Sequence, residues 1–477
     1  MKKSLLFASL VALGASSAFA VSDGFTYPVK DGIAIKSQWI AASGALDPNG
    51  VVNQSALAAW NKLPFAGSNN ARTACIARIP EGGAMVDKIL VAWHDLIPET
   101  TTAGVAHISI INLYNGELEK DLLLTLDGQP TASQLCANQI GCDDFGHVWV
   151  CGYKSTPYNV EKGEASPYNV YQIDMATGAM TLAFTCELPA DEKEATGRTD
   201  YYSLVGDVTR AEAGCAFMTC TCADTQSPYI YGWMCAQGES EFGPLMEEGS
   251  FVSIKPEETY PADQAAWGTA SCVRIVKDED FSAAMFYVDG FTTCPSLYDN
   301  AGGMMDSFAS ATELAPKVGT NGVGEFTIND KNFIFYSLEQ YDSGATCRAR
   351  ICELGEDMAF EGMEEFWTIP EGGLGVTSDG GARYHACETR VYTDANGVEG
   401  AYVLSYKGRN GMAVYTVAPE EWVNDHDAAV GTIAADTDVN APVEYFNLNG
   451  QAVNSNDLVP GLYITRQGSK TAKVVVK

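Results

Sequence analysis

A two-residue pattern that returns six times is the feature that most constrains the fold of this chain. Each copy is a small residue followed by Cys or an acidic residue, and a strand-like run comes after it. The copies are Ala74-Cys75, Gly141-Cys142, Gly206-Asp207, Ser271-Cys272, Gly324-Glu325 and Ala386-Cys387. Their second residues stand 67, 65, 65, 53 and 62 positions apart. A near-regular period of this length indicates repeated supersecondary units.

Each copy is followed by a second run rich in the β-branched and aromatic residues that suit strands. These runs cover residues 89–94, 148–153, 216–221, 285–290, 333–338 and 401–406. Turn-forming pairs such as Asn115-Gly116 punctuate the later strands. Four antiparallel strands per repeat predict an all-β fold, a β-propeller of six blades, with seven blades as the alternative.

The residues before the first repeat are expected to help close the ring. Residues 33–41 are strand-like, but no copy of the small–Cys or small–acid pair belongs to them. We therefore expect them to add a strand to the last blade. The alternative is a seventh, degenerate blade within residues 21–71. The chain therefore divides into an N-terminal segment with the closing strand at 21–71 and a propeller at 72–423.

The first 20 residues are typical of a signal peptide. Lys2 and Lys3 precede a short apolar run, and Ala18-Phe19-Ala20 is a cleavage signal. We therefore expect Ala18 and Ala20 to direct cleavage, with the mature chain starting near Val21, and a protein that is secreted or held on the outer cell surface. The sequence after this segment contains no run of about 20 apolar residues, so we expect no transmembrane helix there.

The end of the chain predicts a separate module. Residues 424–440 are rich in Asp and Ala and form a linker, and residues 441–477 contain three short strand-like runs joined by Gly turns. These predict a small β-sandwich-like module. Its elements are an Asn-x-x-Gly turn at 447–450, a Gly-x-Tyr-apolar strand at 461–464 and a basic–apolar–basic finish at 473–477.

In this order and position, these elements resemble the C-terminal sorting domain of the type IX secretion system of Bacteroidota. The resemblance covers about the last 40 residues. It implies that the module is an outer-membrane export address, usually removed as the protein is released or attached to surface glycolipid. The middle of the chain looks like secreted propellers of the same bacteria, whose ligands are mostly unassigned. A plain terminal β module without a sorting role is the alternative.

The charge of the chain narrows its partners. It holds 29 Lys and Arg against 61 Asp and Glu, a net charge of −32. Such a surface repels nucleic acid and anionic lipid, so neither partner is expected. The partners that we expect are a glycan or another surface protein, and the export machinery through the C-terminal module.

The six-fold column is the first candidate site. On the innermost strands its members would ring the central channel, but metal–ligand bonds of about 2.0–2.6 Å do not reach across a propeller axis. We therefore interpret the Cys members as packing residues and predict no metal or other cofactor. Asp207 and Glu325 break the Cys pattern and are candidate binding residues. The 14 cysteines leave buried thiols and disulfides equally open.

A near-duplicated loop supplies two more candidates. Tyr158 and Tyr168 each lie in a Pro-Tyr-Asn-Val sequence, and exposed Tyr on propeller loops suits contact with glycan or protein. The alternative is that each ring folds back onto its blade.

No nucleophile elbow, Walker loop or zinc-protease motif occurs, so catalytic residues are unknown. A non-enzymatic binding module for glycan or protein is therefore the favoured function. One alternative is a polysaccharide hydrolase or lyase with two carboxylates about 5–9 Å apart in the central pocket. Another is a structural scaffold in the cell envelope.

Overall fold

The computed structural model divides the chain into two compact units, residues 1–418 and 419–477. It describes residues 21–66, 71–95, 104–131, 138–159, 161–192, 197–222, 228–264, 266–276, 284–316, 320–338, 346–376, 384–394, 396–424, 444–446, 452–454, 461–467 and 470–476. The predicted cleavage residues Ala18 and Ala20 lie outside this part of the chain.

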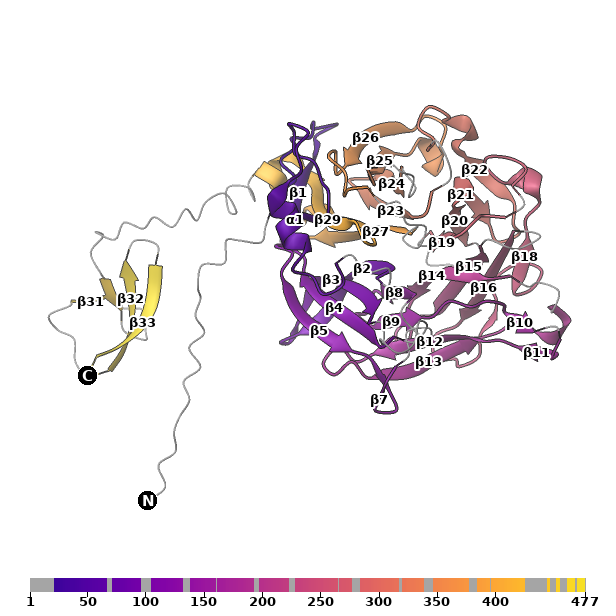
Figure 1. Ribbon diagram of the computed structural model, residues 1–477, viewed down its shortest axis with the longest axis horizontal. Helices are drawn as coiled ribbons and strands as arrows, with labels where there is room; N and C mark the ends of the chain where they lie inside the picture. Colours follow the sequence, from indigo (N-terminus) through magenta and orange to yellow (C-terminus); the bar gives the residue numbers. More distant parts are fainter. Residues whose placement is uncertain are drawn as a thin grey trace, which may run out of the picture. The chain divides into compact units, whose positions relative to one another are not determined.

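The first unit is a six-bladed β-propeller, as the repeat predicts (Figure 1). Each blade is an antiparallel sheet whose first strand lies nearest the axis. The first three blades consist of β2 (Thr73–Glu81), β3 (Ala84–His94), β4 (Ala106–Asn112) and β5 (Leu118–Leu123); β8 (Gln139–Cys142), β9 (Val148–Cys151), β12 (Tyr168–Ile173) and β13 (Met180–Cys186); and β14 (Thr199–Gly206), β15 (Cys215–Thr221), β16 (Tyr229–Cys235), β17 (Gly243–Pro244) and β18 (Phe251–Ser253).

The remaining three blades follow the same plan, and the last takes its outer strand from the N-terminal segment. They consist of β19 (Cys272–Ile275), β20 (Met285–Gly290), β21 (Thr293–Asp299) and β22 (Met304–Ser307); β23 (Val323–Ile328), β24 (Lys331–Ser337), β25 (Ala349–Glu353) and β26 (Glu364–Ile369); and β27 (His385–Thr393), β28 (Glu399–Lys407), β29 (Gly411–Pro419) and β1 (Ile33–Ala42).

Short elements decorate this ring. They are the helix α1 (Gln54–Trp60), the two-residue strand pairs β6 (Thr125–Leu126) with β7 (Gln129–Pro130) and β10 (Tyr158–Asn159) with β11 (Glu164–Ala165), and 3₁₀ turns at Ala190–Glu192, Pro256–Glu258, Phe308–Ser310 and Glu356–Met358. No helix among the described residues combines the length and hydrophobicity needed to cross a bilayer.

Strand β1 closes the ring by pairing with β29, which places the predicted closing segment 33–41 in the last blade. The strand is buried along most of its length. Its Trp39 donates a hydrogen bond from Nε1 to the carbonyl of Leu113, 2.7 Å away, in the first blade. Closure therefore joins the two ends of the blade series through both backbone pairing and a side-chain contact.

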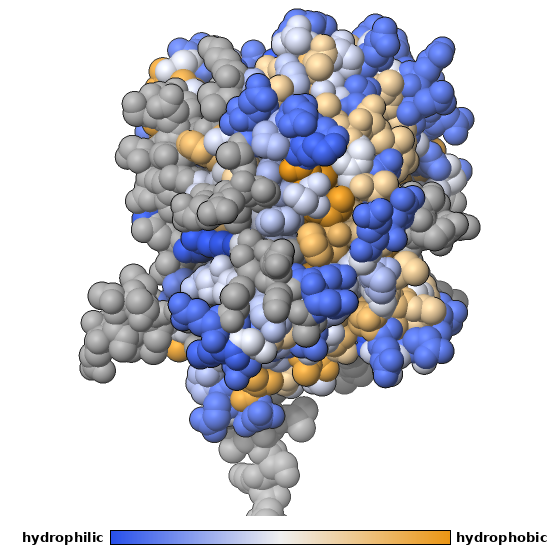
Figure 2. All heavy atoms as spheres, turned by 90° about the vertical axis from the view of Figure 1, so that its right-hand side faces the viewer, coloured by the Kyte–Doolittle hydropathy of each residue, from blue (hydrophilic) through white to orange (hydrophobic). Residues whose placement is uncertain are grey.

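The hydrophobic core lies between neighbouring blades. The middle strands β15 and β28 are buried over all or nearly all of their length, because neighbouring blades cover both of their faces. The outer strand β5 has one buried residue among its six. Apolar runs on middle strands and polar runs on outer strands are the pattern that this packing requires. Figure 2, which views the ring from its side, shows hydrophilic residues spread widely over that surface.

Four turns share an Asp-x-x-Gly sequence and one hydrogen-bond pattern. In each turn an Asp carboxylate accepts the backbone N–H groups two and four residues later, and the intervening Gly has a positive φ. The Asp residues are Asp47, Asp143, Asp299 and Asp394. The carboxylate of Asp143 thus has a structural role before any function is considered.

The second unit holds one antiparallel sheet in its described residues. Its strands are β30 (Glu444–Phe446), β31 (Ala452–Val453), β32 (Gly461–Gln467) and β33 (Lys470–Val476), in the order β31-β30-β32-β33. A sandwich would need a second sheet, which these residues do not supply. Most of the predicted linker at 424–440 lies outside the described residues.

The 13 described cysteines are free thiols, and all except Cys142 are buried. Most of them lie in strands, where Cys packs as a small hydrophobic residue. The sequence left buried thiols and disulfides open; the described cysteines are thiols, buried in every case except Cys142. Burial raises the pKa of Cys142 to about 12 and that of Cys151 to about 12, which keeps both protonated at neutral pH.

Candidate functional site

A cavity of about 580 Å³ lies on the propeller axis, because residues from all six innermost strands line it. Its volume falls within the range of about 300–1,000 Å³ that is usual for small-ligand sites. The wall includes aromatic side chains and a set of charged ones, among them Arg274, Glu325, Glu388 and Arg390. The cavity therefore has a volume and a set of charged side chains that suit a polar ligand.

Two tyrosine rings close the axis at the end where the inner strands begin. Tyr201 lies in β14 and Tyr384 immediately precedes β27, so they come from the third and sixth blades, which face each other across a six-membered ring. Their ring centroids are 3.9 Å apart and nearly parallel, and both residues are buried. Neither lines the cavity, which extends instead to the turns that follow the inner strands. The site is thus a cup with one closed end.

An ion pair crosses the wall of this cup. Nη2 of Arg274, on β19, lies 2.5 Å from Oε1 of Glu388, on β27. Nε of Arg274 also donates to the carbonyl of Val323, at 3.2 Å, so three successive blades are linked. Burial alone would lower the pKa of Arg274, but the Glu388 carboxylate raises it above its ordinary value. Glu388 therefore faces a guanidinium that stays charged.

A second pair lies beside the first. Nε of Arg390 is 3.1 Å from Oδ1 of Asp87, which comes from β3 in the first blade. Burial raises the pKa of the Asp87 carboxyl, and the positive charges of Arg390 and Arg78 only partly offset this. Arg390 is two residues after Glu388 on β27, so both point to the same face of that strand.

Glu325, predicted as a binding residue, lines the cup from β23. It therefore joins Glu388 as a second glutamate in the same cavity, although the two come from different blades. Glu388 was not predicted, and neither were the two arginines. Charged residues inside otherwise apolar strand runs, as in Cys272-Val273-Arg274-Ile275, were the signal that could have revealed them.

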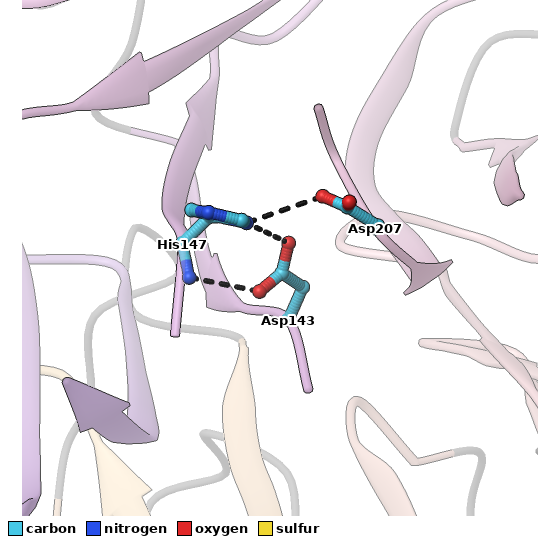
Figure 3. A group of neighbouring side chains, drawn as sticks. All are labelled: Asp143, His147 and Asp207. Atoms are coloured by element: carbon cyan, nitrogen blue, oxygen red, sulfur yellow. Dashed lines mark hydrogen bonds and ion pairs between the residues drawn. The ribbon is translucent and has the colours of Figure 1, made fainter. Parts of the chain in front are cut away.

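Asp207, the other predicted binding residue, belongs to a cluster with Asp143 and His147 at the turns of the second and third blades (Figure 3). Nδ1 of His147 lies 3.0 Å from Oδ2 of Asp143 and 3.2 Å from Oδ1 of Asp207. Both carboxylates are fully buried, whereas the imidazole is partly exposed.

The oxygens of both carboxylates already accept hydrogen bonds. Asp143 accepts the N–H of Phe145 and His147 on one oxygen and the N–H of Val208 on the other. Asp207 accepts N–H groups of Thr209 and Glu212 and the hydroxyl of Thr209.

Burial works against ionisation of Asp207, but these hydrogen bonds lower its pKa below the ordinary value. Three ligand atoms this close could hold a metal ion. The hydrogen bonds to backbone N–H groups, however, already give the two carboxylates a structural role in joining the second and third blades.

Tyr158 and Tyr168 do not lie on an exposed face, which corrects the prediction that they contact a ligand. They are 6% and 0% exposed. Tyr168 packs edge-on against Tyr202, and its hydroxyl accepts a hydrogen bond from Thr199, at 3.3 Å. Tyr168 therefore folds back onto its blade, within the core between blades, and Tyr158 is likewise buried in the short strand β10.

The six members of the repeat column do not form a ring at one level. Cys75, Glu325 and Cys387 are the third residues of their strands, whereas Cys272 begins β19, Cys142 ends β8 and Asp207 follows β14. Three of them, Cys75, Cys142 and Glu325, line the cup.

No protein-family model and no curated protein matches this chain. Among solved structures, it is similar to a mutant of AofleA from Arthrobotrys oligospora, with a TM-score of 0.38 and 8% identity over 86% of this chain and 91% of that one. It is also similar to Trypanosoma rangeli sialidase in complex with sialic acid, with a TM-score of 0.39 and 8% identity over 94% and 70% of the two chains. A third similar structure is the aldose sugar dehydrogenase of Escherichia coli, with a TM-score of 0.34 and 12% identity over 74% and 97%. At these values the likenesses carry no argument about function.

Proposed function

We propose that this propeller is a non-enzymatic binding module that holds a polar ligand, a glycan or part of a protein, in the axial cup. The observation that carries the proposal is the Arg274–Glu388 pair in the wall of a one-ended cavity. Guanidinium and carboxylate groups present several fixed donors and acceptors, which suits recognition of hydroxyl and amide groups. Because each holds the other in place, little side-chain freedom remains to be lost on binding.

A hydrolase or lyase is the second candidate, and one observation favours it: Glu325 and Glu388 line the same cavity. Acid–base cleavage of a glycoside needs one carboxyl group that carries a proton and one that does not. Oε1 of Glu388 already accepts a hydrogen bond from the Arg274 guanidinium, at 2.5 Å, so this carboxylate is engaged in the wall of the cup. This arrangement suits binding better than proton donation.

Binding arrays of glycans and peptides, probed with residues 21–477, test the proposal. Glu388→Gln should weaken the interaction at least tenfold, because it leaves the Arg274 guanidinium without its counter-charge. Glu364→Gln, which alters an exposed outer-strand glutamate, should bind like the wild type.

The binding role would be contradicted if the protein bound nothing on either array. It would also be contradicted if Glu388→Gln, shown by circular dichroism to be folded, bound as tightly as the wild type. Cleavage of a bound glycan, lost in Glu325→Gln, would instead favour the enzyme.

We further propose that the chain is exported and reaches the cell exterior. The proposal is supported by the signal-like residues 1–20 and by the resemblance of residues 441–477 to a sorting domain. Fractionation of producing cells should find the protein outside the cell. A variant that lacks residues 441–477 should be retained in the periplasm. Equal release of both chains would remove the sorting role.

A further inference from the structure

One guanidinium group in the wall of the cup is only partly engaged by the protein. Arg390 lines the cavity from β27, and its Nε lies 3.1 Å from Oδ1 of Asp87. This Nε is buried, whereas Nη1 and Nη2 keep accessible surface and make no hydrogen bond to any described residue. The first blade therefore holds the rear edge of the guanidinium, and both terminal NH2 groups remain available to a ligand in the cavity.

A complementary group lies beside Arg390. Glu388 precedes it by two residues, so strand geometry places the two side chains on the same face of β27, with Cα atoms about 7 Å apart. Oε1 of Glu388 accepts a hydrogen bond from Nη2 of Arg274. Oε2 of Glu388 and Nη1 of Arg274 keep accessible surface and make no hydrogen bond within the described part of the chain. The cup thus presents donors from two arginines and an acceptor from Glu388.

The two guanidinium groups act on the same part of the wall. Arg274 and Arg390 both lower the pKa of the Cys75 thiol, although burial keeps that pKa well above its ordinary value. Cys75 itself lines the cup, from β2 in the first blade. Since Coulomb interactions weaken with distance, a shared effect on one thiol places both positive groups around one region of the cavity.

The wall as a whole is more acidic than basic. Its charged side chains are those of Arg274, Arg390, Asp143, Asp144, Glu325 and Glu388. The planar edge of a guanidinium matches a carboxylate, which accepts two parallel N–H groups. The acidic groups of the wall accept hydrogen bonds and repel further negative charge. The best match is therefore a ligand with one carboxylate and several hydroxyl donors, whereas a polyanionic chain is disfavoured.

We propose that the cup binds one acidic monosaccharide unit, of the uronic acid class, and that Arg390 holds its carboxylate. The inference rests on the proposed binding function and names the class of its ligand. Hydroxyl groups of the same sugar ring donate to Glu388 and the other acidic groups of the wall. Because the stacked Tyr201 and Tyr384 close the far end, the sugar enters from the turns that follow the inner strands.

Isothermal titration of residues 21–477 with single sugars tests this. The probes are D-glucuronate and D-galacturonate, the neutral hexoses D-glucose and D-galactose, and N-acetylglycine as a carboxylate without hydroxyl groups. At least one uronate should bind at least tenfold more tightly than the hexose of the same configuration, because its carboxylate forms charge-assisted hydrogen bonds with Arg390. The preference should shrink in about 0.5 M NaCl, since salt screens the charges.

Variants of Arg390 separate its role from that of the cup. Arg390→Gln should weaken binding of the uronate about tenfold and leave the affinity for the neutral hexose within about twofold of the wild type. Arg390→Lys keeps the charge but not the paired donors, so it should retain only part of the preference. Lys120→Gln, which removes a positive charge from an exposed position on β5, is the matched control and should bind like the wild type. Circular dichroism checks that each variant is folded.

The possible failures are distinguishable. If a uronate and its neutral hexose bind equally well, the carboxylate is wrong and binding in the cup stands. If a uronate binds Arg390→Gln as tightly as the wild type, Arg390 does not hold it and the inference is overturned. If N-acetylglycine binds and no uronate does, the ligand is a peptide carboxylate and the sugar class is wrong. If no probe binds, the inference fails, and the glycan and peptide arrays decide the binding function independently.

Discussion

At the scale of single residues, Asp289 shows how burial and hydrogen bonding compete. The side chain lies in β20 with no exposed surface. Oδ2 accepts hydrogen bonds from Thr320 Oγ1, at 2.6 Å, and from Gly322 N, at 2.8 Å, and Oδ1 lies 2.6 Å from Cys272 Sγ. Burial raises the pKa of this carboxyl to about 6, although these hydrogen bonds favour the ionised form. This buried carboxyl group therefore loses its proton at a higher pH than an exposed aspartate does.

This pKa predicts a particular dependence of stability on pH. Between pH 3.8, the ordinary value, and about 6, folded Asp289 keeps a proton that the unfolded chain has lost. The contribution of Asp289 to the free energy of unfolding therefore falls as the pH rises through this window, by about 3 kcal/mol in total. Asp289→Asn cannot ionise and should lose this fall. Urea titrations at pH 4, 5, 6 and 7 would measure it, and parallel profiles for the two proteins would refute the prediction.

At the scale of elements, the strands were predictable and their heights along the axis were not. Strand composition and turn pairs locate the second strand of every blade, because middle strands need apolar residues on both faces. The repeat column, however, marks different levels of the inner strands, from the first residue of β19 to the position after β14. Sequence spacing fixes how often a blade recurs, but each turn sets where its strand begins. The expected ring of six side chains therefore does not exist.

The candidate site was predictable only in part, for a related reason. Glu325 and Asp207 stood out because they break a pattern, and both lie in or beside polar clusters. The partner of Arg274 is Glu388, 114 residues away, and the two meet because the fourth, fifth and sixth blades are arranged around one axis. Tyr158 and Tyr168 lay in a conspicuous duplication, yet their strand positions turn them inward. Sequence reasoning identifies unusual residues, whereas pairing across blades depends on the fold.

At the scale of the whole molecule, stability depends on how the ring closes. The last blade is completed by β1 from the N-terminal segment, so the two ends of the propeller are held together without a covalent link between them. Trp39 strengthens this junction, since its ring packs on Gly116 and its Nε1 bonds to Leu113 in the first blade. A change at this one residue therefore acts on the contact that keeps the first and last blades together.

Trp39→Ala should lower the free energy of unfolding by about 3–5 kcal/mol, because it empties a buried aromatic site at the closure. Trp39→Phe is the matched variant: it keeps most of the apolar contact and loses the hydrogen bond, so its cost should be nearer 1 kcal/mol. Urea unfolding followed by fluorescence and circular dichroism would compare the three proteins. Equal midpoints for Trp39→Ala and the wild type would mean that pairing of β1 with β29 closes the ring alone. A loss in Trp39→Phe as large as that in Trp39→Ala would instead place the stabilisation in the hydrogen bond to Leu113.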